Sequence, residues 1–120
     1  KVFFFITKGM NRYNDRDQKV YGPDQRTDRI VQLKALTSWG AYYLMKEKVQ
    51  GTLEPGKLAD FLILDKDILT IPEQEIPSVQ VLMTVVGGKV VHLTPQLARE
   101  FGMQPVGATT WKEPIPEGWQ

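Results

Sequence analysis

The feature that most constrains the fold is a pair of β-type runs on either side of two consecutive glycines. "VQVLMTVV" and "KVVHL" are rich in β-branched residues, and Gly87-Gly88 lies between them. Two adjacent glycines supply the two positive-φ positions that a two-residue primed turn needs. The pattern therefore predicts an antiparallel hairpin over residues 79–93.

A helical period precedes this hairpin. The stretch "TDRIVQLKALTSWGAYYLMKEK", residues 27–48, predicts one helix of about five turns. Thr27 and Asp28 are both suitable N-caps, and Lys46 and Lys48 suit the C-terminal end of the helix dipole. One stripe at three- and four-residue spacing comprises Ile30, Leu33, Thr37, Gly40, Ala41 and Leu44, and the opposite flank carries Val31, Ala35, Trp39 and Tyr42. Apolar residues over more than half the circumference predict burial between two layers.

Shorter elements follow from local signals. "FLIL", between Asp60 and Asp65, predicts a short strand buried on both faces. Prolines in "TIPEQEIPSV", residues 70–79, prevent a strand ladder and favour a loop with one helical turn. Thr94 as cap and Pro95 as first residue predict a short helix that ends at Gly102, with Leu97, Ala98 and Phe101 on its inner side. The tail, residues 105–120, has no usable period and is expected to be extended.

The N-terminal third is harder to assign. "KVFFFITKGM" has β-branched and aromatic residues that favour a strand, but so short an apolar run is equally compatible with the end of a buried helix. The polar, turn-rich stretch "NRYNDRDQKVYGPDQR", residues 11–26, predicts a long surface loop.

Composition excludes several kinds of site. The chain has no cysteine and one histidine, His92, so thiolate metal sites and a pair of imidazole ligands are excluded. The formal net charge is +1 and the charges are dispersed, so we expect no nucleic-acid partner. The apolar runs are too short to span a bilayer, so we expect no membrane partner and a soluble protein, with a cytoplasmic location favoured over others. The start at Lys1 suggests a piece of a longer protein, although a processed or tagged start would look the same.

The segment "GTLEPGKL", residues 51–58, resembles a phosphate-binding loop only superficially. Such a loop follows a strand and opens a helix, whereas this segment follows the predicted helix and leads into the "FLIL" strand. Pro55 removes an amide donor, Glu54 adds a negative charge, and Leu58 replaces the hydroxyl that would bind Mg²⁺. We instead predict that Gly51 ends the helical region and that Pro55-Gly56 forms the centre of a type II turn.

The remaining polar and aromatic candidates favour structural roles. His92 is expected to be a partly exposed strand residue. Asp60 and Asp65 bracket a four-residue strand and should lie well over about 10 Å apart, so turn and strand-end capping, also for Asp67, is favoured over acid–base catalysis. Residues Trp39, Tyr42 and Tyr43 are expected in the core rather than around a ligand, and Trp111 and Trp119 are expected to attach the tail to a surface. No Ser/His/Asp triad can be assembled.

One long stretch does resemble a known family. "GTLEPGKLADFLILDKDILTIPEQEIPSVQVLMTVVGGKVVH" resembles the C-terminal signature of metal-dependent amidohydrolases, in the family 3 branch, and the likeness extends over about residues 20–107. The matching positions are Gly51, Leu53, Pro55, Gly56, Lys57, Ala59, Asp60, Asp65, Asp67, Thr84, Val86, Gly87, Gly88 and Lys89.

The resemblance implies a parent enzyme with a (β/α)₈ barrel, in which one or two divalent metals such as zinc activate water to hydrolyse an amide C–N bond. It also implies an accessory β-sandwich. The expected class is therefore α+β: residues 1–50 are the terminal helices of the barrel, residues 51–93 are sandwich strands, and residues 94–120 are a short helix and tail. By the same resemblance "VFFFITKG" is the end of a barrel helix, and we favour a helix there.

The family's metal ligands have no counterpart in these 120 residues, so no catalytic residue, metal ligand or cofactor is assigned to this chain. Our main hypothesis is a C-terminal structural fragment that is inactive alone and whose partner is the rest of the parent chain. The alternatives are a module that self-associates through its wide apolar helix and open strand edges, and a small-ligand binding domain.

Overall fold

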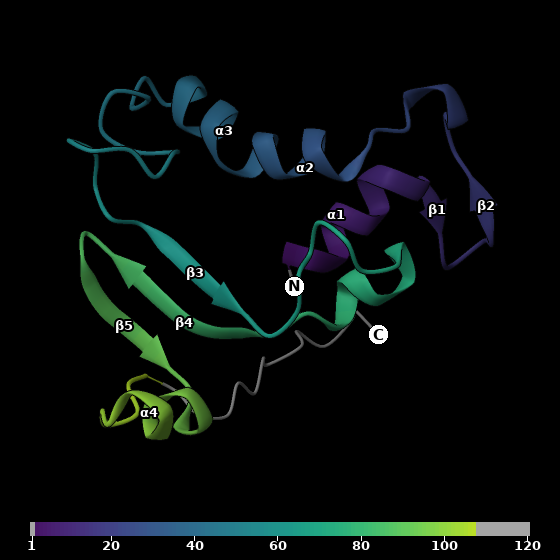
Figure 1. Ribbon diagram of the computed structural model, residues 1–120. Helices are drawn as coiled ribbons and strands as arrows, with labels where there is room; N and C mark the ends of the chain where they lie inside the picture. The colour runs from purple at the N-terminus through teal and green to yellow at the C-terminus, as the bar shows by residue number, and fades with distance from the viewer. Residues whose placement is uncertain (1, 108–120) are drawn as a thin grey trace, which may run out of the picture.

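The computed structural model describes residues 2–107, and these form an α+β arrangement (Figure 1). Helices α1 (Val2–Asn11), α2 (Arg29–Leu36) and α3 (Ser38–Tyr43) lie in the N-terminal half. A three-stranded antiparallel sheet of β3 (Phe61–Leu64), β4 (Val81–Val86) and β5 (Lys89–Leu93) follows, and α4 (Pro95–Phe101) packs on it. The expected α+β class is confirmed.

The N-terminal segment is helical, as favoured above. α1 buries Ile6 and Thr7, and the Thr7 hydroxyl donates to the Phe3 carbonyl within the helix. The loop predicted over residues 11–26 was partly wrong, because it contains the small hairpin β1 (Tyr13–Asn14) and β2 (Lys19–Val20) and a 3₁₀ turn, η1 (Pro23–Gln25). Such short strands leave almost no periodic signal in a sequence.

The single helix predicted over residues 27–48 was wrong: the segment forms two helices, α2 and α3. The break is at Thr37, whose backbone adopts φ −121° and ψ −95°. Its hydroxyl donates to the Leu33 carbonyl at 2.8 Å, and its amide bonds to Lys34 rather than Leu33. Back-bonding by threonine bends helices, which accounts for the interruption. Of the two candidate N-caps it is Asp28 that caps α2, because its carboxylate accepts from the Val31 amide at 2.8 Å.

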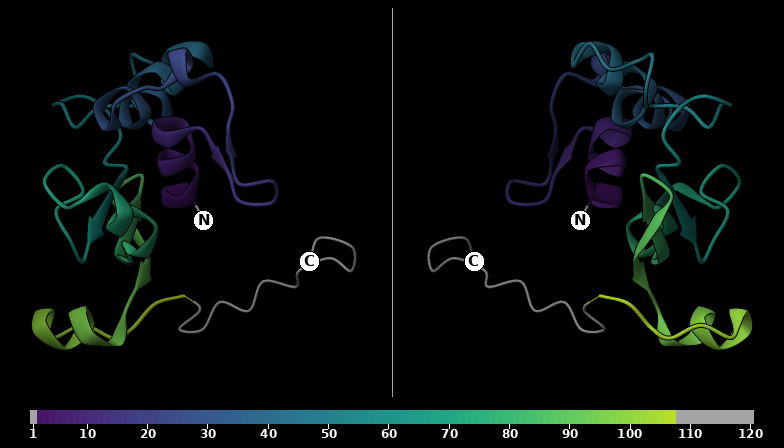
Figure 2. Two further views of the ribbon diagram at one scale, coloured as in Figure 1. Left: turned by 90° about the vertical axis from the view of Figure 1, so that its right-hand side faces the viewer. Right: turned by 90° about the vertical axis from the view of Figure 1, so that its left-hand side faces the viewer.

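Burial of this helical pair between two layers was also wrong. Within residues 29–44 only Ala41 is buried, and the large apolar side chains that are exposed are Ile30, Leu36, Trp39, Tyr42, Tyr43 and Leu44. Figure 2 shows the two helices along one side of the molecule, with open space on their outer face. The apolar stripe is therefore wider than the surface that the other described residues, within 2–107, cover.

The predicted hairpin is confirmed as β4 and β5, with Gly87 and Gly88 at φ 57° and 77°. β3 pairs with the other edge of β4, so the strand order is β3-β4-β5. The prediction that "FLIL" is buried on both faces was wrong, because Leu62 is 50% exposed. Phe61 and Ile63 pack towards α4, while Leu64 packs on a second cluster described below.

α4 begins at Pro95 and ends at Gly102, which has φ 63°, as predicted. Leu97 and Ala98 are buried, but Phe101 is half exposed, so its expected inner position was wrong. Thr94 occupies the N-cap position without a side-chain capping bond. Val106 then pairs with Leu93 at the outer edge of β5. The predictions for Trp111, Trp119 and most of the tail lie outside the described residues.

Two apolar clusters stabilise the fold. One joins the sheet to α4 and comprises Met83, Val85, Leu93, Leu97 and Ala98. The other comprises Ile6, Ile68 and Ile76, and joins α1 to the connector between β3 and β4. That connector carries a 3₁₀ helix, η2 (Glu73–Ser78), in agreement with the predicted loop with a helical turn.

Candidate functional site

The segment "GTLEPGKL" forms a turn, not a phosphate loop. The Lys57 amide donates to the Glu54 carbonyl at 3.1 Å, and Gly56 has φ 91°, which are the bond and the positive φ that a type II turn requires. The Lys57 ammonium binds the Thr52 hydroxyl at 2.7 Å and the Glu54 carboxylate at 3.0 Å. The next described element is the strand β3, whereas a phosphate-binding loop leads into a helix.

This polar cluster alters the acidity of Glu54. Hydrogen bonds from Lys57 and Thr52, together with the positive charge of Lys57, lower the pKa of the Glu54 carboxyl below its ordinary value. A pKa that is lower in the folded state means that ionised Glu54 favours the folded turn above the unfolded-state pKa. This contribution is lost as the pH falls through the folded-state pKa.

We therefore expect Lys57→Met to raise the pKa of Glu54 back towards its ordinary value, as measured by carboxyl-carbon NMR titration. Lys66→Met is the matched control, because Lys66 pairs with Glu75 at 2.9 Å and not with Glu54. An unchanged pKa of Glu54 in Lys57→Met would contradict the ion pair between the Lys57 ammonium and the Glu54 carboxylate.

Asp60 connects the start of β3 to the tip of the β4–β5 hairpin. Its carboxylate accepts from the Gly87 amide at 2.6 Å, and the Gly88 amide donates to the Ala59 carbonyl at 3.0 Å. One side-chain bond and one backbone bond thus join Ala59-Asp60 to Gly87-Gly88, which are remote in the sequence. The capping role expected for Asp60 is observed, with the hairpin glycines as its partners.

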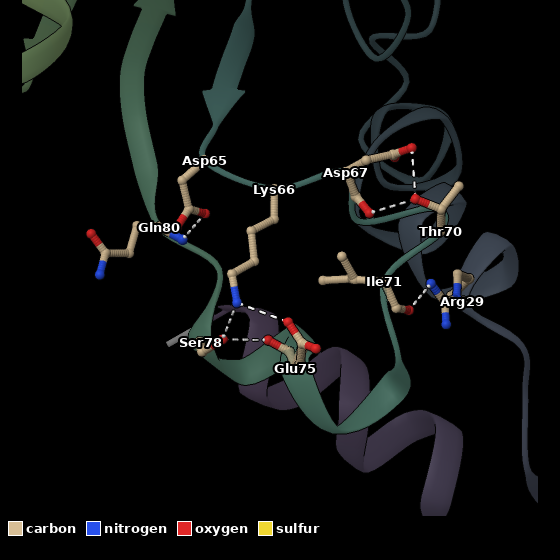
Figure 3. Close-up of polar contacts among 9 residues, drawn as sticks. All are labelled: Arg29, Asp65, Lys66, Asp67, Thr70, Ile71, Glu75, Ser78 and Gln80. Atoms are coloured by element: carbon tan, nitrogen blue, oxygen red, sulfur yellow. Dashed lines mark hydrogen bonds and ion pairs between the residues drawn. The ribbon is translucent and has the colours of Figure 1, made fainter.

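Asp65 and Asp67 occupy the other end of β3 (Figure 3). Asp65 accepts from the Gln80 amide at 2.7 Å, while Asp67 accepts from the Leu69 amide at 3.0 Å and the Thr70 hydroxyl at 2.9 Å. Asp60 and Asp65 therefore bind different backbone groups at opposite ends of the strand. The structure does not bring them together as an acid–base pair.

The connector that Asp65 begins is held by two basic residues, also drawn in Figure 3. The Lys66 ammonium binds Glu75 at 2.9 Å and the Ser78 hydroxyl at 3.2 Å. The Arg29 guanidinium, at the start of α2, donates to the carbonyls of Ile68 and Ile71 at 2.9 and 2.8 Å. The Lys66 bonds close the connector on itself, and the Arg29 bonds attach it to α2, while Ile68 and Ile76 pack against α1.

The aromatic residues of α3 are not in the core, so that prediction was wrong. Trp39, Tyr42 and Tyr43 are exposed, Tyr43 by 85%, because no other described element covers this face of the helix. His92 is half buried on β5, opposite Thr84, as expected for a strand residue.

A groove of about 700 Å³ lies between the helical pair and the sheet. We call it the α3–sheet groove. Its apolar walls include Leu36, Ala41, Leu44, Leu53, Leu62 and Val86, and Asp60, Thr37 and Thr84 are among its few polar residues. Sequence reasoning missed it, because its walls come from segments up to fifty residues apart and no local pattern relates them. Because the walls of the groove are mainly apolar, the groove is better suited to contact with an apolar surface than to binding a substrate for reaction.

Metal binding finds no support in the part of the chain that the structure describes. Within residues 2–107, no group of three or more His, Asp or Glu side chains is placed to hold a metal ion. The helices in that range also lack the length and apolar character of a membrane span.

Comparison with known proteins places this geometry in context. A family model described as the amidohydrolase family matches residues 1–92. The match runs from α1 into β5 and includes the whole segment from Gly51 to Lys89. No curated protein and no solved structure shows significant similarity to the chain.

Proposed function

The chain belongs to the amidohydrolase family, and from this premise we propose that it is the C-terminal structural module of a metal-dependent amidohydrolase. The parent enzyme hydrolyses non-peptide amide C–N bonds. The module itself is inactive, and its partner is the remainder of the enzyme.

One observation carries the proposal. The three aspartates of the family-like segment are bound to the chain's own backbone: Asp60 to Gly87, Asp65 to Gln80, and Asp67 to Leu69. A carboxylate that accepts a short bond from a turn or strand-end amide stabilises that turn. These residues therefore act in folding, which is what a structural module requires of them.

The metal implied by the family does not fit the residues described. A hydrolytic zinc site uses three protein ligands and leaves a fourth position open for water. The one histidine of the chain, His92, lies on β5 opposite Thr84, and no acidic pair joins it within residues 2–107. We therefore derive no catalytic step for this chain and assign the metal ligands to the remainder of the enzyme.

The exposed apolar surfaces favour the existence of a partner that covers them. The outer face of α2 and α3 and the α3–sheet groove present large apolar side chains to solvent. Contiguous apolar patches of this kind mark interaction surfaces. In this proposal residues 1–50 are the terminal helices of the barrel, residues 51–93 are strands of the accessory β-sandwich, and residues 94–120 are a short helix and tail.

The test is hydrolysis by the purified chain. We expect no turnover of N-acyl amino acids with added Zn²⁺, while an intact family member assayed beside it is active. Turnover that requires metal and disappears with a chelator would overturn the proposal. The assay should include circular dichroism of the chain, so that an unfolded sample is not mistaken for an inactive one.

Self-association is the second candidate, and the same exposed apolar residues favour it. β3 also leaves one edge of the sheet open to pairing among the described strands. Light scattering at increasing concentration distinguishes the two: a monodisperse monomer contradicts self-association and leaves the structural-module proposal intact.

A further inference from the structure

We draw no further inference here: the strongest candidate, the α3–sheet groove between the helical pair and the sheet, lies on the apolar surface that the proposed function already assigns to the remainder of the enzyme, and nothing in the structure shows what covers it.

Discussion

Leu93→Ala is expected to lower the free energy of unfolding by about 2–5 kcal/mol, the range for deleting a fully buried leucine side chain. Leu93 is 0% exposed and lies in the cluster that joins the sheet to α4. Its backbone exchanges two hydrogen bonds with Val106, at 2.8 and 3.2 Å, which keeps the site from collapsing around the cavity. Small domains are marginally stable, so this one change should leave a large unfolded fraction.

Leu62→Ala is the matched control, because it removes the same atoms from the same sheet. Leu62 is 50% exposed, so it loses much less buried surface, and we expect a cost below about 1 kcal/mol. Urea denaturation followed by circular dichroism measures both variants. Equal costs would contradict the packing of α4 on the Leu93 face of the sheet.

Gly51→Ala is expected to destabilise the chain by about 2–5 kcal/mol through two effects that add. The residue has φ 98°, which strains any side chain. In addition, a Cβ atom at this position would lie 2.5 Å from the Ala41 Cβ and 3.2 Å from the Thr37 carbonyl. The turn segment and α3 would therefore have to separate, which opens the α3–sheet groove at its helical wall.

Gly56→Ala separates these two effects. Gly56 has φ 91° but no atom within 4 Å of the added Cβ, so only the backbone strain applies, about 1–2 kcal/mol. The clash itself is tested in an Ala41→Gly background, where Gly51→Ala should cost about 1 kcal/mol less. If Gly51→Ala and Gly56→Ala have the same cost, the close approach of residue 51 to α3 is wrong.

Elements that depend on local chemistry could be predicted from the sequence. The Gly87-Gly88 hairpin, the Pro55-Gly56 turn and the limits of α4 each follow from a backbone angle that only certain residues adopt readily. The capping role of Asp60 could also be anticipated, because aspartate binds nearby amides. Its partner could not, since Gly87 lies twenty-seven residues away.

Predictions that depend on what a surface packs against were less successful. Apolar residues over more than half the helix circumference in residues 27–48 indicated burial. Whether they are buried depends on another part of the structure that packs against them, and the sequence of the helix does not specify that part. The break at Thr37 was missed for a related reason. The Thr37 hydroxyl donates to the Leu33 carbonyl. The spacing of apolar residues does not show whether a threonine side chain will bond to the helix backbone in this way.

The sequence by itself determined the turns at Pro55-Gly56 and Gly87-Gly88, the limits of α4, and the membership of the amidohydrolase family. Each of these depends on the backbone angles of a few adjacent residues or on a long contiguous pattern. Only the tertiary structure decided that the aspartates bind backbone amides at opposite ends of β3 and that the α3 aromatics are exposed. Whether a side chain is buried, and which remote residue it contacts, depends on the distances between segments that are far apart in the sequence. These distances are fixed only when the helical half and the sheet pack together.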